Sequence, residues 1–270
     1  MIVYQSPTNT IHRADARQVA AEQEAGSFSL AVLDGPYGMR KAAWDMMKVS
    51  ELPEWYAPHL DDVGRLCAPS ASLYVWNTAE GWATLHPGIV ARGWTFRSLV
   101  VWDKLNVMGS WTPSAGFSNQ TEVCGHYTRG TTPHVLGGNV WRMCAAGNPA
   151  WGGRSLAAER LFSDATRPNV RGGVQRVPLH PCQKPLTFAG RIIRASSRPG
   201  ERVWVPFGGT CREAVAAEWM ARAEPDEARR VVTCEIDEDG RDYLGAVVRQ
   251  IRGEDVRPRD PRQGSLFGAA

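Results

Sequence analysis

The segment Asp34-Gly35-Pro36-Tyr37 combines residue types that can hold a flat ring bearing an amino group. The Asp34 carboxylate can accept a hydrogen bond from an exocyclic NH2, the Pro36 carbonyl can accept its second hydrogen, and the Tyr37 ring can stack on the base. The preceding apolar run, Ser29 to Leu33, is typical of a buried strand, and open α/β sheets bind ligands where such strands end. The alternative interpretation is an ordinary turn, because Asp, Gly and Pro are common turn formers.

A second segment near the other end of the chain has the pattern of a nucleoside site. A strand over residues 202–205, the loop Pro206-Phe207-Gly208-Gly209-Thr210, a helix over 213–222 and a strand over 231–235 form a β-α-β unit. Glycines in the first turn let the backbone approach a ligand, and Glu235 at the end of the next strand can accept hydrogen bonds from ribose hydroxyls. The loop lacks the full G-x-G-x-x-G pattern, so nicotinamide or flavin binding is disfavoured.

The elements that must position these two segments alternate between strand and helix. Strands are predicted over residues 73–77 and 96–102, and helices over 79–91, 188–197 and 239–251. This order predicts an α/β fold with a mostly parallel sheet covered by helices on both faces. A chain of 270 residues can form one large domain of this kind or two small ones.

The alternation fails over residues 104–178, which are rich in Gly, Pro, Thr, Asn and Trp, with short strands predicted only near 122–128 and 139–143. Arginine among Trp, Asn and Gln suits phosphate contacts combined with base-edge readout, so we predict a basic irregular insertion that contacts DNA. The alternative is a solvated loop region. The region 104–178 has more basic residues than acidic ones. The basic residues are Lys104, Arg129, Arg142, Arg154, Arg160, Arg167, Arg171 and Arg176, and the acidic residues are Glu122, Glu159 and Asp164.

Composition narrows the class of protein further. No apolar run reaches the roughly 18 residues of a membrane span, and the first residues lack a basic region followed by an apolar core, so a cytoplasmic protein is expected. The six cysteines include no C-x-x-C pair, so neither a metal site nor a disulfide framework is predicted. The net charge of +3 says little about partners, because DNA binding needs a local basic surface.

Together these segments resemble the β-class DNA amino-methyltransferases of the adenine-N6 or cytosine-N4 type, whose Asp-Pro-Pro-Tyr loop precedes the cofactor segment. The strongest match is His180 to Pro185, which reproduces the H-P-x-Q-K-P signature. Four further segments resemble family elements: Ile11 to Ala16 (I-x-x-G-D-C), Val101 to Lys104 (W-x-K), Pro199 to Thr210 (P-G-D-x-V-x-D-P-F-x-G-S) and Cys234 to Asp237 (G-x-E-x-D). The resemblance spans nearly the whole chain and implies a Rossmann-like methyltransferase fold.

The resemblance also implies residue roles. Asp34, Pro36 and Tyr37 would be catalytic, and the cofactor would be S-adenosylmethionine. The implied cofactor contacts are Phe207, Gly209 and Thr210 in the cleft, Glu235 on the ribose, Asp15 and Ala16 near the adenine, and Gln183 and Lys184 near the amino-acid end. For Lys184 the alternative is an exposed lysine at a helix start. Glu122 stands where the family often carries a Glu before an apolar strand.

Three departures from the family pattern affect these expectations. Gly35 replaces the first Pro of the catalytic loop, which is expected to loosen it. Val205 replaces the usual Asp before Pro-Phe, and Cys211 with Arg212 replaces the usual Gly-Thr. A missing carboxylate and an added side chain near the cofactor are expected to weaken its binding, and restoring Asp at position 205 is expected to strengthen it.

The resulting hypothesis is a DNA methyltransferase that acts on the exocyclic amine of a flipped base. In the family, Asp at the first loop position favours adenine N6 over cytosine N4. The predicted organisation is a catalytic half (1–103), a target-recognition region (104–178), a cofactor-binding half (179–252) and a flexible tail (253–270). Two alternatives remain: a catalytically weakened DNA-binding relative, and a methyltransferase with a non-DNA substrate.

The tail carries a separate signal. Gln263-Gly264-Ser265-Leu266-Phe267 follows a charged, Pro-broken stretch and resembles the Q-x-x-L-F peptides that dock on the bacterial replication sliding clamp. Leu266 and Phe267 would fill an apolar pocket while Gln263 hydrogen-bonds at its rim. The alternative is a disordered tail whose Leu-Phe pair packs back on the domain.

Overall fold

The computed structural model describes residues 1–40, 42–105, 120–132, 137–143, 162–168, 174–180, 182–236 and 242–254, with 162–168 and 174–178 described for their backbone. Its strands are β1 (Ile2–Gln5), β2 (Asn9–Arg13), β3 (Phe28–Leu33), β4 (Cys67–Asn77), β5 (Thr95–Asp103), β6 (Thr121–Arg129), β7 (Val140–Arg142), β8 (Phe162–Pro168), β9 (Val174–Pro178), β10 (Arg202–Val205) and β11 (Arg230–Glu235). Its helices are α1 (Ala16–Glu22), α2 (Leu52–Leu66), α3 (Ala79–Ala91), α5 (Leu186–Ser196), α6 (Arg212–Ala223) and α7 (Tyr243–Arg252), with the short 3-10 turns η1 (Ala43–Asp45), η2 (Val49–Glu51) and η4 (Pro225–Glu227).

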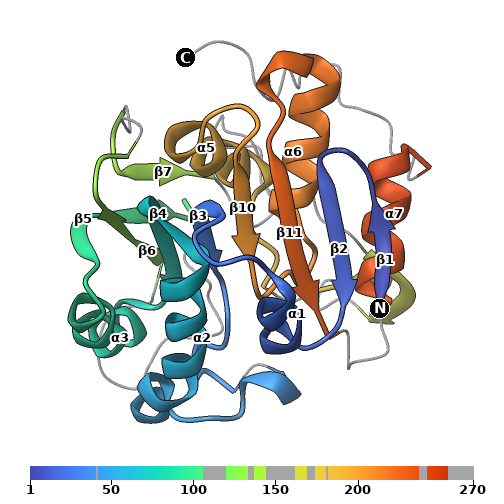
Figure 1. The fold of residues 1–270 in the computed structure, drawn as a ribbon. Coiled ribbons are helices and arrows are strands. Elements are labelled where there is room, and N and C mark those ends of the chain that lie inside the picture. Colours follow the sequence, from blue (N-terminus) through green and yellow to red (C-terminus); the bar gives the residue numbers. More distant parts are fainter. Residues whose placement is uncertain are drawn as a thin grey trace.

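Nine of these strands form one mixed sheet in the order β1-β2-β11-β10-β3-β4-β6-β5-β7 (Figure 1). β2, β11, β10, β3 and β4 pair in parallel, while β1 and β6 run antiparallel to their neighbours. The chain passes from β3 through α2 to β4 in one direction and from β10 through α6 to β11 in the other. The crevice between the carboxyl ends of β3 and β10 is therefore a topological switch point, where such sheets bind ligands.

The sheet is buried on both faces, as the sequence predicted. In β3, Leu30 and Val32 pack in one apolar cluster and Ala31 and Leu33 in another, which follows the two-residue period of a strand. The first cluster includes the apolar faces of α5, α6 and α7, and the second includes those of α1, α2 and α3 (Figure 1). This three-layer packing holds the ends of β3 and β10 on a rigid base.

The two short strands expected inside the region 104–178, near residues 122–128 and 139–143, are β6 and β7. β6 lies inside the sheet, hydrogen-bonded to β4 on one side and to β5 on the other, and β7 extends the same sheet at its edge. Of the remaining described part, β8 and β9 pair antiparallel with each other. Because β6 runs against the parallel strands, its first residues lie at the carboxyl edge where the ligand crevice opens, and its last residue, Arg129, lies at the opposite edge.

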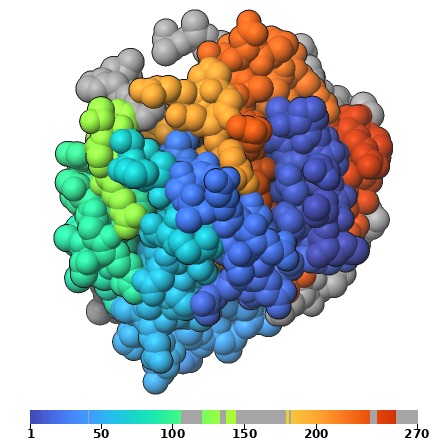
Figure 2. Space-filling model, viewed as in Figure 1, coloured from blue at the N-terminus to red at the C-terminus, as the bar shows by residue number. Residues whose placement is uncertain are grey.

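The two ends of the chain meet in the sheet. β2 pairs in parallel with β11, so the N-terminal hairpin belongs structurally with the predicted cofactor-binding half. In Figure 2 the N-terminal segment (blue) accordingly lies beside the C-terminal segment (orange to red) on the visible face. A boundary at residue 103 therefore does not separate the two predicted halves in space. In the described part of the chain, no helix is long and apolar enough to cross a membrane.

Candidate active site

A cavity of about 310 Å³ opens at the switch point and joins the two chemically informative segments. It has the size typical of a small-molecule site. Nine of the predicted site residues line it: Asp34, Pro36, Tyr37, Gln183, Lys184, Phe207, Gly209, Thr210 and Glu235. The loop after β3 and the glycine turn after β10 thus form two ends of one cavity, which we call the catalytic end and the cofactor end.

The catalytic loop is held by Asp45, a residue that the sequence analysis did not single out. The carboxylate of Asp45 accepts hydrogen bonds from the backbone N–H groups of Tyr37 (2.8 Å), Gly38 (2.6 Å) and Met39 (3.0 Å). Its side chain is buried, so these bonds are shielded from water. These three bonds fix residues 37–39 of the loop, while the loosening expected from Gly35 stays a prediction.

Gly35 itself fits a crowded position. A Cβ atom there would lie 2.7 Å from the Tyr56 hydroxyl and 3.0 Å from the Phe207 ring, so the family's Pro would require these neighbours to move. The same Tyr56 hydroxyl donates to the Pro36 carbonyl at 3.3 Å, and Asn77 Nδ2 donates to it at 3.4 Å. A carbonyl oxygen has two lone pairs. Two donors of the chain thus already approach the Pro36 carbonyl, and its contact with the target amine stays a prediction.

Asp34 lies in a buried network of opposite charges. Lys184 Nζ is 2.9 Å from Asp34 Oδ1 and 3.2 Å from Glu122 Oε2, and Lys104 Nζ is 2.6 Å from Glu122 Oε1. The side chain of Lys184 is only 7% exposed, so the alternative of an exposed helix-start lysine is wrong. Its ammonium lies on the Asp34 carboxylate, while its predicted place at the amino-acid end of the cofactor stays a prediction.

Burial and pairing set the charge states of this network. Burial alone would raise the pKa of Glu122, but the two lysines lower it to about 2. Burial would likewise lower the pKa of Lys184, yet Asp34 and Glu122 raise it above its ordinary value. Burial raises the pKa of Asp34, and Lys184 opposes that rise. The network therefore holds Lys184 as an ammonium group at neutral pH.

Tyr37 contributes more than its ring. Its hydroxyl lies 2.8 Å from Asp34 Oδ1 and 3.4 Å from Glu122 Oε2 and donates to the carboxylates. Burial and the two acids raise its pKa well above the ordinary value, so the hydroxyl keeps its proton. Lys184 Nζ lies 5.1 Å from the centre of the Tyr37 ring, within cation–π range. Tyr37 is thus a positioning group for Asp34 in addition to its predicted stacking role.

The cofactor end is built from the glycine turn and Glu235. Glu235 Oε2 accepts a hydrogen bond from the Gly209 N–H at 2.5 Å, which ties the end of β11 to the turn after β10. Gly209 has φ +50, and a Cβ on Gly208 would lie 2.7 Å from Thr233 Oγ1, so both positions favour glycine. Cys211, where the family has Gly, also has a left-handed φ of +44, which is strained for a residue with a Cβ.

Two predicted cofactor contacts lie outside this cavity. Asp15 is exposed and caps helix α1, where its carboxylate accepts from the backbone N–H groups of Arg17 (2.8 Å) and Gln18 (3.3 Å). Ala16, the first residue of that helix, is buried against the apolar cluster below it. Neither residue lines the cavity, so the structure does not support their predicted place at the adenine.

The predicted DNA-contacting residues are either paired inside the fold, exposed, or outside the described part of the chain. Arg129 is committed to the fold, because its guanidinium donates to the carbonyls of Gly64 (3.0 Å) and Arg92 (2.7 Å) and lies over the Trp94 ring. Lys104 is committed to Glu122, whereas the side chain of Arg142 is 70% exposed and lies 3.5 Å from Asp103. Arg154 and Arg171 lie outside the described residues.

Several cavity residues were not found from the sequence. Besides Asp45, the cavity wall includes Glu213 in the first turn of α6, Ile236 directly after Glu235, and Trp44, whose ring stacks on His180 with centroids 5.6 Å apart. Trp44 and Asp45 are adjacent in the sequence and follow the loop at residues 34–38 closely. This Trp-Asp pair was the sequence signal by which the two residues could have been found. Nothing local in the sequence marks Glu213.

The described residues contain no cluster of His, Cys, Asp and Glu suited to holding a metal ion. Within the described part, Cys67, Cys124, Cys182, Cys211 and Cys234 are free thiols, and Cys144 lies outside it. The sliding-clamp motif at residues 263–267 also lies outside the described residues.

The loop that carries Asp34 and the glycine turn meet at one switch point, which is the arrangement expected of an S-adenosylmethionine-dependent amino-methyltransferase. The sequence profile of the N6/N4 DNA methylases matches residues 28–244, so the chain belongs to this DNA methylase family. The chain is also 27% identical to the type II methyltransferase M1.MboII of Moraxella bovis over 79% of its own length and 89% of that protein. The family resemblance and its cofactor are thereby confirmed.

Solved structures support the fold. The cytosine-N4-specific PvuII DNA methyltransferase superposes with a TM-score of 0.64 at 14% identity, covering 93% of this chain and 95% of that one. The M1.HpyAVI–SAM complex superposes with a TM-score of 0.54 at 16% identity, covering 90% of this chain and 100% of that one. The predicted Rossmann-like methyltransferase fold is confirmed.

Proposed function

We propose that this protein is a site-specific DNA methyltransferase that methylates the exocyclic amine of a flipped base, with adenine N6 favoured over cytosine N4. The observation that supports this most is the position of Asp34 at the switch point, in the same cavity as the glycine turn and Glu235. Bound S-adenosylmethionine supplies the electrophilic methyl group. Asp34, rather than the Ser common in cytosine-specific relatives, is the reason to favour adenine.

One oxygen of Asp34 remains available for the target amine. Both Lys184 (2.9 Å) and Tyr37 (2.8 Å) contact Oδ1, and no described residue makes a hydrogen bond to Oδ2. A hydrogen bond from the amine to Oδ2 would orient the nitrogen and balance the positive charge that develops on it during transfer. Lys184 and Tyr37 then serve as positioning residues that fix the carboxylate plane.

The remaining cavity residues have proposed roles in binding. Glu235 would accept hydrogen bonds from the ribose, while Phe207, Gly209 and Thr210 line the path of the cofactor and Gln183 lies beside Lys184. Trp44 adds a second aromatic ring to the wall of the same cavity, which suits stacking of a base that has left the duplex. Arg142, exposed at the same edge of the sheet, is the described residue best placed for a phosphate contact.

The test is methylation-sensitive long-read sequencing of DNA from a methylation-free host that expresses the chain. A sequence-specific N6-methyladenine signal that disappears in an Asp34→Ala variant supports the proposal. An N4-methylcytosine signal would correct the base. No DNA signal from a folded protein that binds S-adenosylmethionine would support one of the two alternatives, the weakened relative or the non-DNA substrate.

The clamp motif stays a prediction that a separate measurement addresses. A fluorescent peptide of residues 260–270 is expected to bind the purified bacterial sliding clamp, and changing Leu266 and Phe267 to Ala is expected to abolish binding. Absence of binding at a clamp concentration of about 100 μM, well above the dissociation constant expected of a functional short motif, would discard this partner.

A further inference from the structure

Glu213 is an acid of the cavity wall to which neither the family pattern nor the proposed chemistry gives a role. It belongs to the first turn of α6, lines the cavity and is 8% exposed. Its hydrogen bond is to its own backbone N–H, and it forms no ion pair in the described part of the chain. A buried carboxylate without a cationic partner is costly and points to a ligand that supplies the charge.

The neighbouring cations are already committed elsewhere. Lys184 is shared by Asp34 and Glu122, as described above. The guanidinium of Arg212 donates to the Thr210 carbonyl at 2.8 and 2.6 Å and to Gln250 at 2.9 Å. Burial raises the pKa of Glu213 to about 7, Asp34 adds to the rise, and Arg212 and Lys184 oppose it. Within the described part of the chain, neither Lys184 nor Arg212 forms a hydrogen bond or an ion pair with Glu213.

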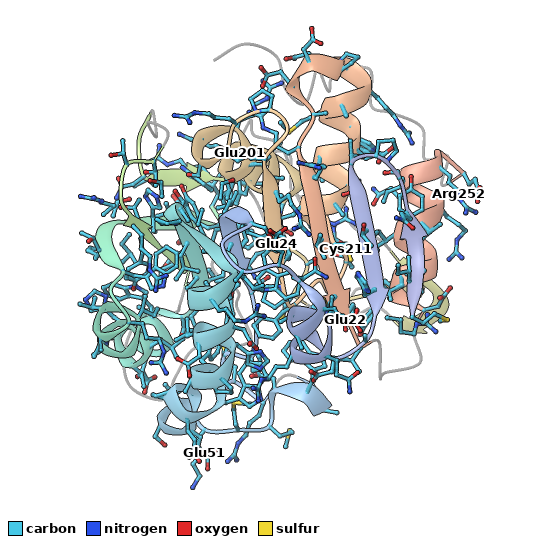
Figure 3. The ribbon with its side chains drawn as sticks, viewed as in Figure 1. Glu22, Glu24, Glu51, Glu201, Cys211 and Arg252 are labelled. Atoms are coloured by element: carbon cyan, nitrogen blue, oxygen red, sulfur yellow. The ribbon has the colours of Figure 1, made fainter. Side chains whose placement is uncertain are left out.

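The topology places Glu213 at the cofactor end of the cavity, in the helix that follows the glycine turn. β10 lies between β11, which ends at Glu235, and β3, which leads to Asp34, and α6 follows β10 directly. In Figure 3, Cys211 at the start of α6 lies near the middle of the view, whereas Glu51 and Arg252 project at its edge. A cofactor that extends from Glu235 to Asp34 must therefore pass the first turn of α6.

The cofactor carries two cationic groups, its sulfonium and the α-ammonium of its amino-acid part. The sulfonium methyl must face the amine held by Asp34, which leaves the ammonium for the remaining acid. We propose that Glu213 binds the α-ammonium group of the cofactor, a role that rests on the proposed function. Val205, where the family has Asp, is buried in the core and is absent from the cavity wall. The carboxylate on the cavity wall comes from helix α6 instead, through Glu213.

Calorimetry of the full-length protein and its Glu213→Gln variant with three nucleosides tests this role. S-adenosylmethionine and S-adenosylhomocysteine both carry the ammonium, whereas methylthioadenosine lacks the amino-acid part. Glu213→Gln is expected to weaken the first two by about tenfold or more and methylthioadenosine by less than about twofold, because one charged hydrogen bond is lost. Glu235→Gln is the matched control, which should weaken all three ligands alike, since they share the ribose.

A pH series gives an independent readout. In the parent protein the affinity for S-adenosylmethionine is expected to fall as pH drops from 8 to 6, because Glu213, with its pKa raised to about 7, becomes protonated. This acid limb should be absent in Glu213→Gln.

Each other outcome overturns the assignment. Equal weakening of all three ligands would give Glu213 a role in the adenosine pocket or in folding. Weakening of S-adenosylmethionine alone would place Glu213 at the sulfonium, and unchanged affinities would place it on the base side or nowhere. A parent protein that binds none of the ligands would contradict the proposed function as well, whereas normal parent binding with an unaffected variant contradicts only the Glu213 role.

Discussion

At the catalytic end of the cavity, Asp34, Asp45 and Glu122 all have partners within the chain, whereas at the cofactor end Glu213 makes no ion pair in the part that the structure describes. The first end is organised before any ligand arrives, which suits groups that must meet a developing charge without rearranging. The second end is completed by its ligand. The comparison teaches that chemistry and cofactor affinity are encoded separately, so that single substitutions can affect one without the other.

The strongest test of this separation is Asp34→Ala. We expect methyl transfer to DNA to fall by about 100-fold or more, because a charge-stabilising group is removed. Single-turnover methyl incorporation measures this rate. Cofactor affinity should stay within a few-fold of the parent, since Asp34 acts on the target amine. Activity within about tenfold of the parent would contradict the catalytic assignment.

Asp45 should matter through geometry. In Asp45→Ala three backbone N–H groups lose their acceptor, so we expect kcat to fall by about 10- to 100-fold with little change in cofactor KM, and unfolding to become easier by about 3 kcal/mol. Asp45→Asn retains one acceptor oxygen and should recover part of both losses. Steady-state kinetics and denaturant titration provide the two readouts. Equal kcat values in Ala, Asn and parent proteins would show that the loop does not depend on Asp45.

At the cofactor end, Val205→Asp should lower stability by about 3 kcal/mol, because it buries a carboxylate in the apolar cluster below the sheet. This expectation replaces the sequence-based one, in which the restored acid strengthens cofactor binding. Thermal unfolding measures the loss, and Val205→Thr, which is nearly isosteric and uncharged, should lose less. A stable Val205→Asp protein with tighter S-adenosylmethionine binding would reinstate the earlier interpretation.

The smallest effect is expected for Tyr37→Phe. Loss of the hydroxyl that holds Asp34 should slow transfer about 3- to 10-fold, because one hydrogen bond of about 1 kcal/mol is removed while the ring is kept. Tyr37→Ala, which also removes the ring, should be more severe. Single-turnover rates at saturating cofactor distinguish the two. An unchanged rate in Tyr37→Phe would leave stacking as the only role of Tyr37.

Local patterns sufficed for much of the fold. The predicted helix over residues 79–91 is α3 and the predicted strand over 202–205 is β10, because apolar periodicity and turn residues mark both ends of these elements. The cavity residues that belong to family motifs, such as Asp34, Lys184 and Glu235, were also predicted from the sequence. What failed depended on distant partners: the burial of Lys184 follows from Asp34 and Glu122, and the place of β6 follows from its pairing with β4 and β5. Neither relation leaves a periodic trace in one sequence.

The ion pair between Lys104 and Glu122 has a consequence for how such proteins diversify. Lys104 directly follows β5, and Glu122 is the second residue of β6, next to Thr121, which pairs with Asp103 in the sheet. Any sequence that joins these strands begins and ends at two residues that are ion-paired with each other, Lys104 and Glu122. Glu122 also contacts Lys184, which is paired with Asp34. The segment between β5 and β6, one part of the proposed recognition region 104–178, can therefore be lengthened, shortened or exchanged during evolution while the Asp34 carboxylate keeps its place. New target sequences become accessible without a new active site.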